Sequence, residues 1–295
     1  MIPARIFILT LLAMTAFAGN SLLCRLALKQ TSIDAATFTS IRILSGAAVL
    51  WVISRFRKKR AGGAGNWPSA LALFAYAAAF SFAYISLPAG TGALLLFAAV
   101  QATMIIWGLR KGERLRARQW VGLAFAFGGL VALLFPGLSA PPAGGSILML
   151  GAGVAWGIYS LRGKAGAGDP VRTTAGNFLR AVPWAAGLSI ALLPWAGLNS
   201  AGLTYAILSG AIASGLGYTI WYTALPGLTA ASAATVQLSV PVLAAAGGII
   251  FLRESMTLRF LFASLSIISG IALVVLEKRR TVASLNKELE PAGGA

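Results

Sequence analysis

Long apolar stretches separated by short polar clusters make up almost the whole chain. Ten of them approach or exceed the ~17 residues with which a helix begins to span about 30 Å of hydrocarbon. Gly and Ala are frequent in them, and strand-like alternation is scarce, so we predict helices rather than a β-barrel. The expected fold is an all-α polytopic membrane protein with ten transmembrane helices, at residues 6–27, 34–54, 68–87, 91–109, 119–136, 145–162, 173–194, 203–224, 228–252 and 258–277.

The composition narrows the class of protein. Of the 295 residues, 58% are hydrophobic and 11% are charged, whereas about a quarter are charged in an ordinary soluble domain. This excludes a water-soluble enzyme and a disordered chain, and the single cysteine excludes a disulfide scaffold. The net charge of +17 would suggest a nucleic-acid partner. Because the cations lie between apolar stretches, we assign them to the surface of the lipid bilayer instead and expect no nucleic acid.

The two ends of the chain need separate interpretation. Arg5, an apolar stretch and Ala16-Phe17-Ala18 together resemble a secretory signal with its cleavage site. We expect this stretch to remain as the first span, because its apolar character resumes after Gly19 and it has a counterpart later in the chain. Residues 281–295 are polar and small, and we predict a disordered cytoplasmic tail.

The positions of Lys and Arg predict the orientation. With a cytoplasmic N-terminus, the basic clusters within 55–60, 110–118, 162–172 and 278–287 all lie inside. The outer side then receives few cations, namely Arg25, Lys29, Arg253 and Arg259. Since cytoplasmic loops carry the excess of Lys and Arg, both termini are predicted to be cytoplasmic.

The second half of the chain repeats the first. We predict two repeats, residues 1–140 and 141–280, each with five spans. An odd number of spans gives the two halves opposite orientations, which is the architecture of alternating-access transporters with a site at the middle of the membrane. When the sequence is compared with itself at an offset of 138 residues, identical residues coincide at five places: Gly19 with Gly157, Arg42 with Arg180, Tyr84 with Tyr222, Pro88 with Pro226 and Thr91 with Thr229. Beyond the ninth span the offset becomes 141 residues, which pairs Glu113 with Glu254.

Several short motifs carry a family resemblance. They are Trp156-Gly157-Ile158-Tyr159, Gly217-Tyr218 with Trp221-Tyr222, and the span-ending Gly112-Glu113-Arg114 and Leu252-Arg253-Glu254. In their order and spacing, the chain resembles the drug/metabolite transporter superfamily in its EamA-type ten-helix form, over about residues 6–277. The resemblance implies a bacterial inner-membrane exporter of metabolites rather than an enzyme, and the chain looks most like the branch that exports aromatic amino acids. It departs from an even repeat in the fourth span, which is shorter than the ninth and has no match for Pro241.

The candidate binding residues are those that helix rise places near the middle of the membrane. They combine aromatic rings with uncharged hydrogen-bonding groups, which suits an amphipathic small molecule with a large apolar part. The amides can bind amino and carboxylate groups; the alternative is that all these side chains only pack helices together. The set is Phe17, Asn20, Tyr76, Phe80, Gln101, Trp156, Tyr159, Tyr218, Gln237 and Ser239.

Arg42 and Arg180 are the buried cations of the predicted second and seventh spans. A central Arg costs about 2.5–3.5 kcal/mol on insertion scales, so a partner must offset that cost. Carbonyl oxygens of broken helices, water in a cavity and a substrate carboxylate are the candidates. The structural alternative is an Arg that holds loop carbonyls or extends its head to the membrane surface.

The paired Tyr and Pro residues suggest gates. Tyr84 and Pro88 lie at one mouth of the predicted repeat, and Tyr222 and Pro226 lie at the opposite mouth. Proline at a turn is ordinary, so a turn without a gate remains the alternative. We predict that Tyr84 helps to close the outer mouth and Tyr222 the inner one.

Absent residue types limit the mechanism. The chain has no His, and its acidic residues fall at span ends, loops and tail, so no carboxylate for proton coupling lies within a span. We expect no metal, no cofactor and no catalytic residues, and a monomer that moves its substrate downhill. Open alternatives are a transporter of phosphorylated or nucleotide-sugar metabolites or of organic cations, a membrane-embedded lipid-modifying enzyme, and a receptor or channel.

Overall fold

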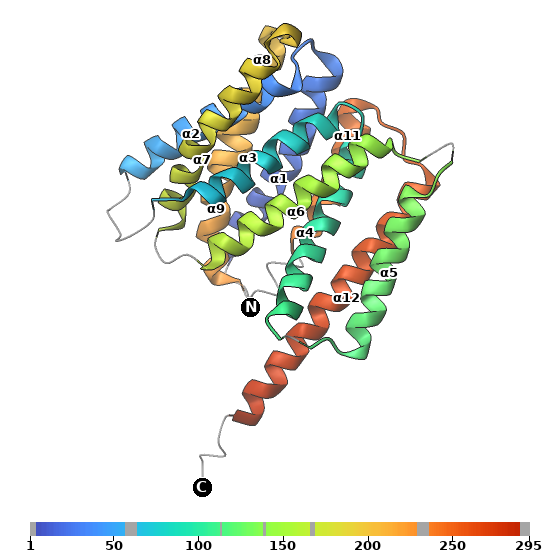
Figure 1. The fold of residues 1–295 in the computed structure, drawn as a ribbon. Coiled ribbons are helices and arrows are strands. Elements are labelled where there is room, and N and C mark those ends of the chain that lie inside the picture. Colours follow the sequence, from blue (N-terminus) through green and yellow to red (C-terminus); the bar gives the residue numbers. More distant parts are fainter. Residues whose placement is uncertain are drawn as a thin grey trace.

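The computed structural model describes residues 4–56, 64–112, 114–137, 140–165, 169–228 and 236–289, and all regular elements in these ranges are helical (Figure 1). The α-helices are α1 (Ala4–Gln30), α2 (Ala35–Phe56), α3 (Trp67–Tyr84), α4 (Ala89–Arg110), α5 (Ala117–Leu134), α6 (Ala143–Ala165), α7 (Pro170–Ala191), α8 (Ser200–Ile207), α9 (Gly217–Ala224), α11 (Ser239–Leu252) and α12 (Leu258–Leu289). Three short elements, η1 (Leu193–Trp195), η2 (Leu208–Leu216) and η3 (Leu225–Gly227), join them.

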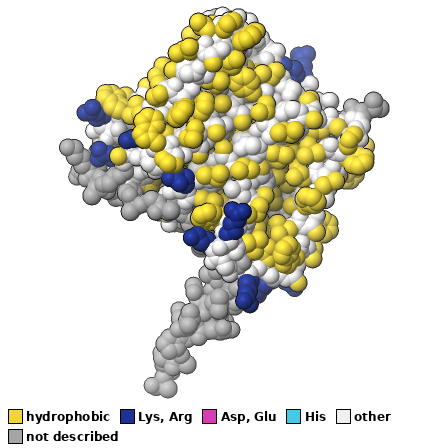
Figure 2. Space-filling model, viewed as in Figure 1, with side chains coloured by type: hydrophobic (Ala, Val, Ile, Leu, Met, Phe, Trp, Pro, Cys, Tyr) yellow, Lys and Arg dark blue, Asp and Glu magenta, His cyan; other side chains and the backbone are white. Residues whose placement is uncertain are grey.

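The predicted all-helical membrane fold is confirmed. Within the described residues, eight helical segments are long and apolar enough to cross a membrane, with α8, η2 and α9 acting as one such segment and α11 as a shorter apolar helix. α7 is more polar, since its first turns carry Arg172, Thr173, Thr174 and Asn177. Figure 2 shows one face of the molecule covered largely by hydrophobic side chains, with the Lys and Arg side chains toward its margins. This is the surface that a helix bundle needs in lipid.

Local sequence accounts for several helix starts. Asn66 accepts a hydrogen bond from the Ser69 backbone N–H, and Asn199 accepts one from the Gly202 N–H. Asp169 likewise accepts a hydrogen bond from the Val171 N–H before Pro170 opens α7. Such caps satisfy N–H groups that have no partner inside the helix, and proline at the first helical position loses nothing by lacking one.

Contacts between connections show that the helices alternate in direction. Asp34, after α1, bonds to Gly197, between η1 and α8, and Arg259 of α12 bonds to the Phe135 carbonyl after α5. The α1–α2, α5–α6, α7–α8 and α11–α12 connections therefore share one face, which we call the outer face after the predicted orientation. Asn66, before α3, bonds to Asn177 of α7 on the opposite, inner face. α1 and α6, the first helices of the two halves, consequently run in opposite directions (Figure 1).

The helix pairings stay the same when the two halves of the chain are exchanged. α2 packs against α7, α4 against α11, and α5 against α12, so each of these pairs joins corresponding helices. The packing of α3 on α6 has its counterpart in the packing of α8, η2 and α9 on α1. The predicted repeat is therefore visible in the pattern of contacts.

α5 and α12 form a close pair at one side of the bundle (Figure 1). Gly122 and Gly270 face each other so closely that a Cβ on Gly122 would lie 2.5 Å from the Gly270 carbonyl oxygen. Gln119 donates a 3.1 Å hydrogen bond to the Val274 carbonyl, and Ser266 donates one of 2.7 Å to the Phe125 carbonyl. Small residues and hydrogen bonds of this kind hold helices together in lipid, where apolar burial alone gives little advantage.

The predicted eighth span contains a feature that the sequence analysis did not anticipate. Residues 208–216 form a π-helix, and the Gly217 N–H at its end bonds to the Ile212 carbonyl five residues earlier. Gly210 within it lies directly against the Arg42 carbonyl of α2, where no side chain fits. Wider turns of this kind redirect the side chains that follow them and occur often at functional sites.

Two predictions about the later part of the chain differ from the structure. The ninth span was predicted at 228–252, but its helix α11 begins at Ser239, after a turn at Leu238. The corresponding helix of the first half, α4, runs unbroken over 22 residues. The two halves therefore differ at this position. α12 continues to Leu289, so the first part of the expected disordered tail is helical instead, in keeping with its helix-forming Ala, Leu, Lys and Glu residues. Glu113, Thr229 and residues 57–60 lie outside the described residues.

Candidate functional site

A small cavity lies in the middle of the bundle, where the two halves meet. Its volume is about 20 Å³, which suffices for about one water molecule and is far too small for a metabolite. It takes residues from α1, α3 and α4 of the first half and from α6, η2 and α9 of the second. The lining is Phe17, Asn20, Ser21, Tyr76, Phe80, Leu96, Phe97, Trp156, Ala213 and Tyr218, with no charged residue among them.

Six of the ten predicted binding residues line this cavity: Phe17, Asn20, Tyr76, Phe80, Trp156 and Tyr218. The other four do not. Tyr159 is buried beside it, with its ring 5.4 Å from that of Trp156. Gln101 is buried elsewhere on α4, and Gln237 and Ser239 lie half-buried around the start of α11, where the Ser239 hydroxyl bonds to the Val236 carbonyl. Their predicted depth does not give the side of the helix on which each residue lies.

Trp156 is the centre of the aromatic lining. Its ring centroid lies 4.8 Å from that of Tyr76 of the first half and 5.2 Å from that of Tyr218 of the second half. Phe17 meets the Tyr218 ring edge-on at 5.8 Å, and Phe80 lies 5.4 Å from Tyr76. These rings offer stacking surface from both halves to a molecule that sits between them.

A chain of hydrogen bonds connects the polar groups of the site across the two halves. The Ser209 hydroxyl of η2 donates to Asn20 Oδ1 at 2.6 Å, and Asn20 Nδ2 donates to the Tyr76 hydroxyl at 3.4 Å. Arg42 Nη2 donates to the same hydroxyl at 3.0 Å. The network therefore links α1, α2 and α3 to the π-helix.

Ser209 and Ala213 are site residues that the sequence analysis missed. Both belong to the π-helix, which brings Ser209 to Asn20 and Ala213 to the cavity. The available signal was the composition of residues 208–217, in which Gly and Ser repeatedly interrupt an otherwise apolar span. Such residues favour bends and bulges in helices, but they do not reveal which side chains a bulge redirects.

The symmetry-related arginines have different surroundings. Arg180 Nη1 donates to the Ala64 carbonyl, in the segment before α3, and to the Gly176 carbonyl at 3.0 Å. Arg180 thus fits the structural alternative of an Arg that holds loop carbonyls. Arg42 is only 2% exposed, and its guanidinium lies 4.8 Å from the Phe80 ring centroid and 5.2 Å from that of Tyr76. Within the described ranges of the chain, its Nη1 has no hydrogen-bond partner.

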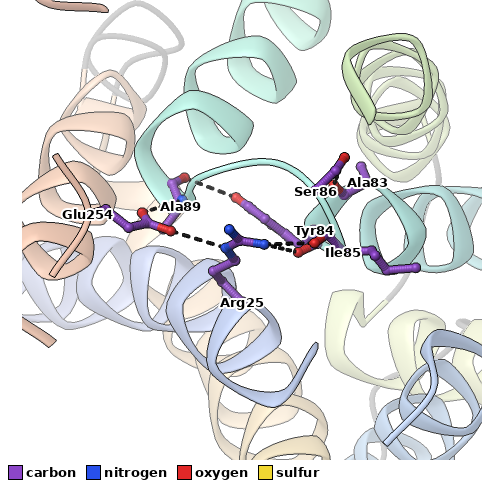
Figure 3. Close-up of polar contacts among 7 residues, drawn as sticks. All are labelled: Arg25, Ala83, Tyr84, Ile85, Ser86, Ala89 and Glu254. Atoms are coloured by element: carbon purple, nitrogen blue, oxygen red, sulfur yellow. Dashed lines mark hydrogen bonds and ion pairs between the residues drawn. The ribbon is translucent and has the colours of Figure 1, made fainter. Parts of the chain in front are cut away.

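A second polar cluster, which we call the outer network, joins the halves at the outer face (Figure 3). Arg25 of α1 donates to the carbonyls of Tyr84 and Ile85 at 2.8 and 2.9 Å, and its Nε lies 3.1 Å from Glu254 Oε1. The other oxygen of Glu254 accepts a 2.8 Å bond from the Ala89 N–H at the start of α4. The outer network thereby holds the α3–α4 turn between α1 and the α11–α12 connection.

The inner face has its own contacts between halves, which we call the inner network. The backbone N–H of Asn66 donates to Asn177 Oδ1 at 2.9 Å, and Arg162 of α6 donates to the Ser69 hydroxyl at 3.1 Å and to Asn66 Oδ1 at 3.3 Å. The N-terminus of α3, from the first half, is thus fixed to α6 and α7 of the second. The inner network therefore joins the two halves on the inner face, as the outer network does on the outer face.

The predicted gate residues lie at opposite faces. Tyr84 is fully buried at the outer end of α3, where its hydroxyl donates to the Ala89 carbonyl at 3.2 Å and Pro88 precedes α4. Tyr222 is half-buried in α9, with its hydroxyl beside Gly163 at the inner end of α6. Pro226 lies in η3, just after α9, and is exposed.

In the part of the chain that the structure describes, no three His, Cys, Asp or Glu side chains are grouped as metal ligands are. The arrangement offers aromatic surface, uncharged hydrogen-bonding groups and one buried cation.

Comparison with known proteins agrees with this architecture. The EamA-like transporter family matches residues 4–135 and 143–276, one match in each half. An uncharacterized protein of Pseudomonas aeruginosa is 57% identical over 272 residues, covering 92% of this chain and 94% of that protein. An uncharacterized transporter of Archaeoglobus fulgidus is 24% identical over 92% of this chain and 98% of its own length.

A solved structure shares the fold. Described only as the crystal structure of a protein, it superposes with a TM-score of 0.65 at 19% sequence identity and covers 91% of this chain and 98% of its own. The two family matches span the two halves that the helix pairings relate to each other. This chain is a membrane transporter of the EamA-like transporter family.

Proposed function

We propose that the protein exports aromatic and other apolar amino acids across the bacterial inner membrane by alternating access, with both termini in the cytoplasm. One observation carries the proposal: the cavity between the two halves is lined by aromatic rings and uncharged polar groups. Rings of Trp156, Tyr76 and Tyr218 suit a large apolar side chain. Asn20 and the tyrosine hydroxyls supply the few polar contacts that fix the orientation of a ligand.

Alternating access requires that each mouth open while the other stays closed. The outer network and the inner network both join the first half to the second, so either can be released by a relative movement of the halves while the other remains. A cavity of about 20 Å³ must widen before a metabolite enters. Opening at one face provides that space without rearranging the helices themselves.

Transport into proteoliposomes tests the proposal. We expect saturable movement of phenylalanine, tryptophan and leucine, and little movement of phosphorylated sugars or of quaternary ammonium compounds. Trp156→Ala should lower transport of the aromatic substrates by about 10-fold or more, because it removes the central ring of the site. The matched control is Trp184→Ala, since Trp184 is 46% exposed on the lipid-facing side of α7.

The result that would contradict the proposal is selective transport of another class of compound. Movement restricted to organic cations or to phosphorylated metabolites would replace the amino acids as the substrates. Equal effects of the Trp156 and Trp184 substitutions would remove the central cavity as the binding site.

A further inference from the structure

The site contains hydrogen-bond donors that have no acceptor. Arg42 Nη1 is buried and bonds to no group of the residues that the structure describes. The Tyr76 oxygen accepts bonds from Arg42 Nη2 and from Asn20 Nδ2, so its own proton remains available, and no acceptor for that proton is found among the described residues. A buried donor without a partner costs about 1–3 kcal/mol, and more when it is charged. Arg42 Nη1 and the Tyr76 hydroxyl therefore both need a hydrogen-bond acceptor.

These donors lie at the wall of the central cavity. The guanidinium of Arg42 rests on the rings of Tyr76 and Phe80, and both rings line the cavity. The positive charge therefore lies one side chain from the space where a ligand would bind. The rings of Tyr76 and Phe80 are cation–π partners of the guanidinium, but they supply no negative charge.

The carboxylates of described side chains bond to groups other than Arg42. Asp34 bonds to the backbone N–H groups of Ala36, Thr37 and Gly197, and Asp169 accepts a hydrogen bond from Val171. Glu254 bonds to Arg25 and to the Ala89 N–H. These three carboxylates lie at helix ends, whereas Arg42 lies within α2 and is buried.

Arg180 occupies the same position of the other repeat and differs from Arg42 in burial and in partners. It is half-buried, and its Nη1 donates to two carbonyl groups. Arg42 is buried, and its Nη1 has no partner among the described residues. An arginine that only braced helices would be expected to resemble Arg180.

We propose that Arg42 and the Tyr76 hydroxyl bind the carboxylate of the transported molecule, whose ring lies against Trp156 and Tyr218. A guanidinium presents two parallel N–H groups that match the two oxygens of a carboxylate. The inference rests on the proposed function for the position of the site and adds the charge of the substrate. Molecules with a carboxylate are accepted, and their uncharged or purely cationic analogues are rejected by the unpaired cation.

Four related probes separate the two charges of an amino acid. They are phenylalanine, phenylalanine amide, 3-phenylpropionate and phenethylamine, measured for binding to the purified full-length protein and for transport in proteoliposomes. The wild-type protein should bind the two acids about 10- to 100-fold more tightly than the amide or the amine, as expected for a charge-assisted hydrogen-bonded pair. Arg42→Gln should abolish this preference by weakening binding of the acids.

Two further variants keep the test decisive if Arg42→Gln fails to fold. Tyr76→Phe retains the ring and removes one donor, so it should weaken binding of the acids by several-fold and leave the amide unchanged. Arg180→Gln is the matched control, because it removes the equivalent arginine of the other half. It should lower thermal stability without changing the ratio of acid to amide affinities.

The outcomes distinguish this inference from the proposed function. Equal affinity for phenylalanine and its amide, or a preference that survives in both Arg42→Gln and Tyr76→Phe, overturns the carboxylate role while amino-acid transport stands. Arg42-dependent binding of 3-phenylpropionate without transport of phenylalanine supports the carboxylate role and rejects amino acids as cargo. Failure of all carboxylates to bind overturns both.

Discussion

Arg25 and Glu254 form an ion pair of 3.1 Å although 229 residues separate them in the chain. Arg25 belongs to the first half and Glu254 to the second, and both side chains are about 10% exposed. The Arg253 backbone adopts the left-handed conformation at the end of α11, with φ of 52°, and the next N–H returns to the Gly248 carbonyl. This reversal brings the Glu254 carboxylate to both Arg25 and the start of α4.

We expect Glu254→Gln to favour opening of the outer face. The substitution removes the charge of the pair and weakens the bonds to Arg25 and Ala89. Cys24, the single cysteine of the chain, is fully buried next to Arg25 in α1 and serves as the reporter. Its labelling by a small maleimide should accelerate by about 10-fold, the effect of losing a charge-assisted hydrogen bond.

Lys29→Gln is the control for the outer network. Lys29 lies one turn after Arg25 on α1 but is exposed, so its loss should leave the labelling rate of Cys24 unchanged. Equal rates in Glu254→Gln and wild-type protein would show that the ion pair does not hold the outer face closed.

The opposite pattern of cysteine labelling is expected when the inner network is weakened. Arg162→Gln removes the bonds from α6 to Ser69 and Asn66, so it should favour opening at the inner face and not at the outer one. A cysteine introduced at Thr174, which is 2% exposed on α7, should then label faster in a Cys24→Ser background. Cys24 itself should keep its wild-type rate in Arg162→Gln. Faster labelling at both positions would indicate general destabilisation rather than opening at one face.

The free energy of unfolding should decrease at acidic pH, because the Asp34 carboxylate becomes protonated. Burial alone would raise the pKa of this carboxyl, but hydrogen bonds from the Thr37 hydroxyl and from the N–H groups of Thr37, Gly197 and Ala36 hold it below its ordinary value of 3.8. Its contribution is therefore fully present above that value and is lost as the pH falls through the lowered pKa of the folded state.

Thermal unfolding between about pH 6 and about pH 3, followed by tryptophan fluorescence, measures this contribution. Wild-type protein should be more stable than Asp34→Asn at the higher pH by about 1 kcal/mol, as for loss of a charged helix cap. The difference should shrink toward the acid end. A difference that stays constant with pH would mean that Asp34 does not titrate in this range.

Gly210 is expected to tolerate no side chain. A Cβ at this position would collide with the Arg42 carbonyl and the Ser45 hydroxyl, so Gly210→Ala must separate η2 from α2. We expect a loss of about 1–3 kcal/mol in the free energy of unfolding, the usual cost of overpacking. Gly151→Ala is the control, because Gly151 is exposed on α6 with no neighbour within 4 Å. Similar stabilities of the two variants would contradict the close approach of η2 and α2.

The sequence allowed much of this architecture to be predicted. Stretch length and hydropathy located the helices to within a few residues in most cases, because a span must cover a fixed thickness of hydrocarbon. The repeat was readable because Arg42 and Arg180, and Tyr84 and Tyr222, keep the same spacing. The exceptions were the ninth span, where α11 starts only at Ser239, and the end of the last helix, since α12 continues to Leu289.

The candidate site was predictable only in part. Trp156 and Tyr76 were found by their expected depth, yet Gln101 and Gln237, expected at the same depth, do not line the cavity. Hydropathy does not fix the rotation of a helix that is apolar on all sides. Ser209 was missed because the π-helix to which it belongs was not predicted. The contrast between Arg42 and Arg180 was hidden as well, since equal positions in a repeat do not give equal surroundings.

The pairing of α5 with α12 has a consequence for biosynthesis. Three of the four buried residues of α5, namely Gln119, Gly122 and Gly129, contact α12, which is synthesised after all the other described helices. α5 therefore stays in the bilayer without its main neighbour until α12 has been made. For the same reason, two fragments divided between α5 and α6 would each retain one member of the pair, and their reassembly in a cell that makes both would begin at these two helices.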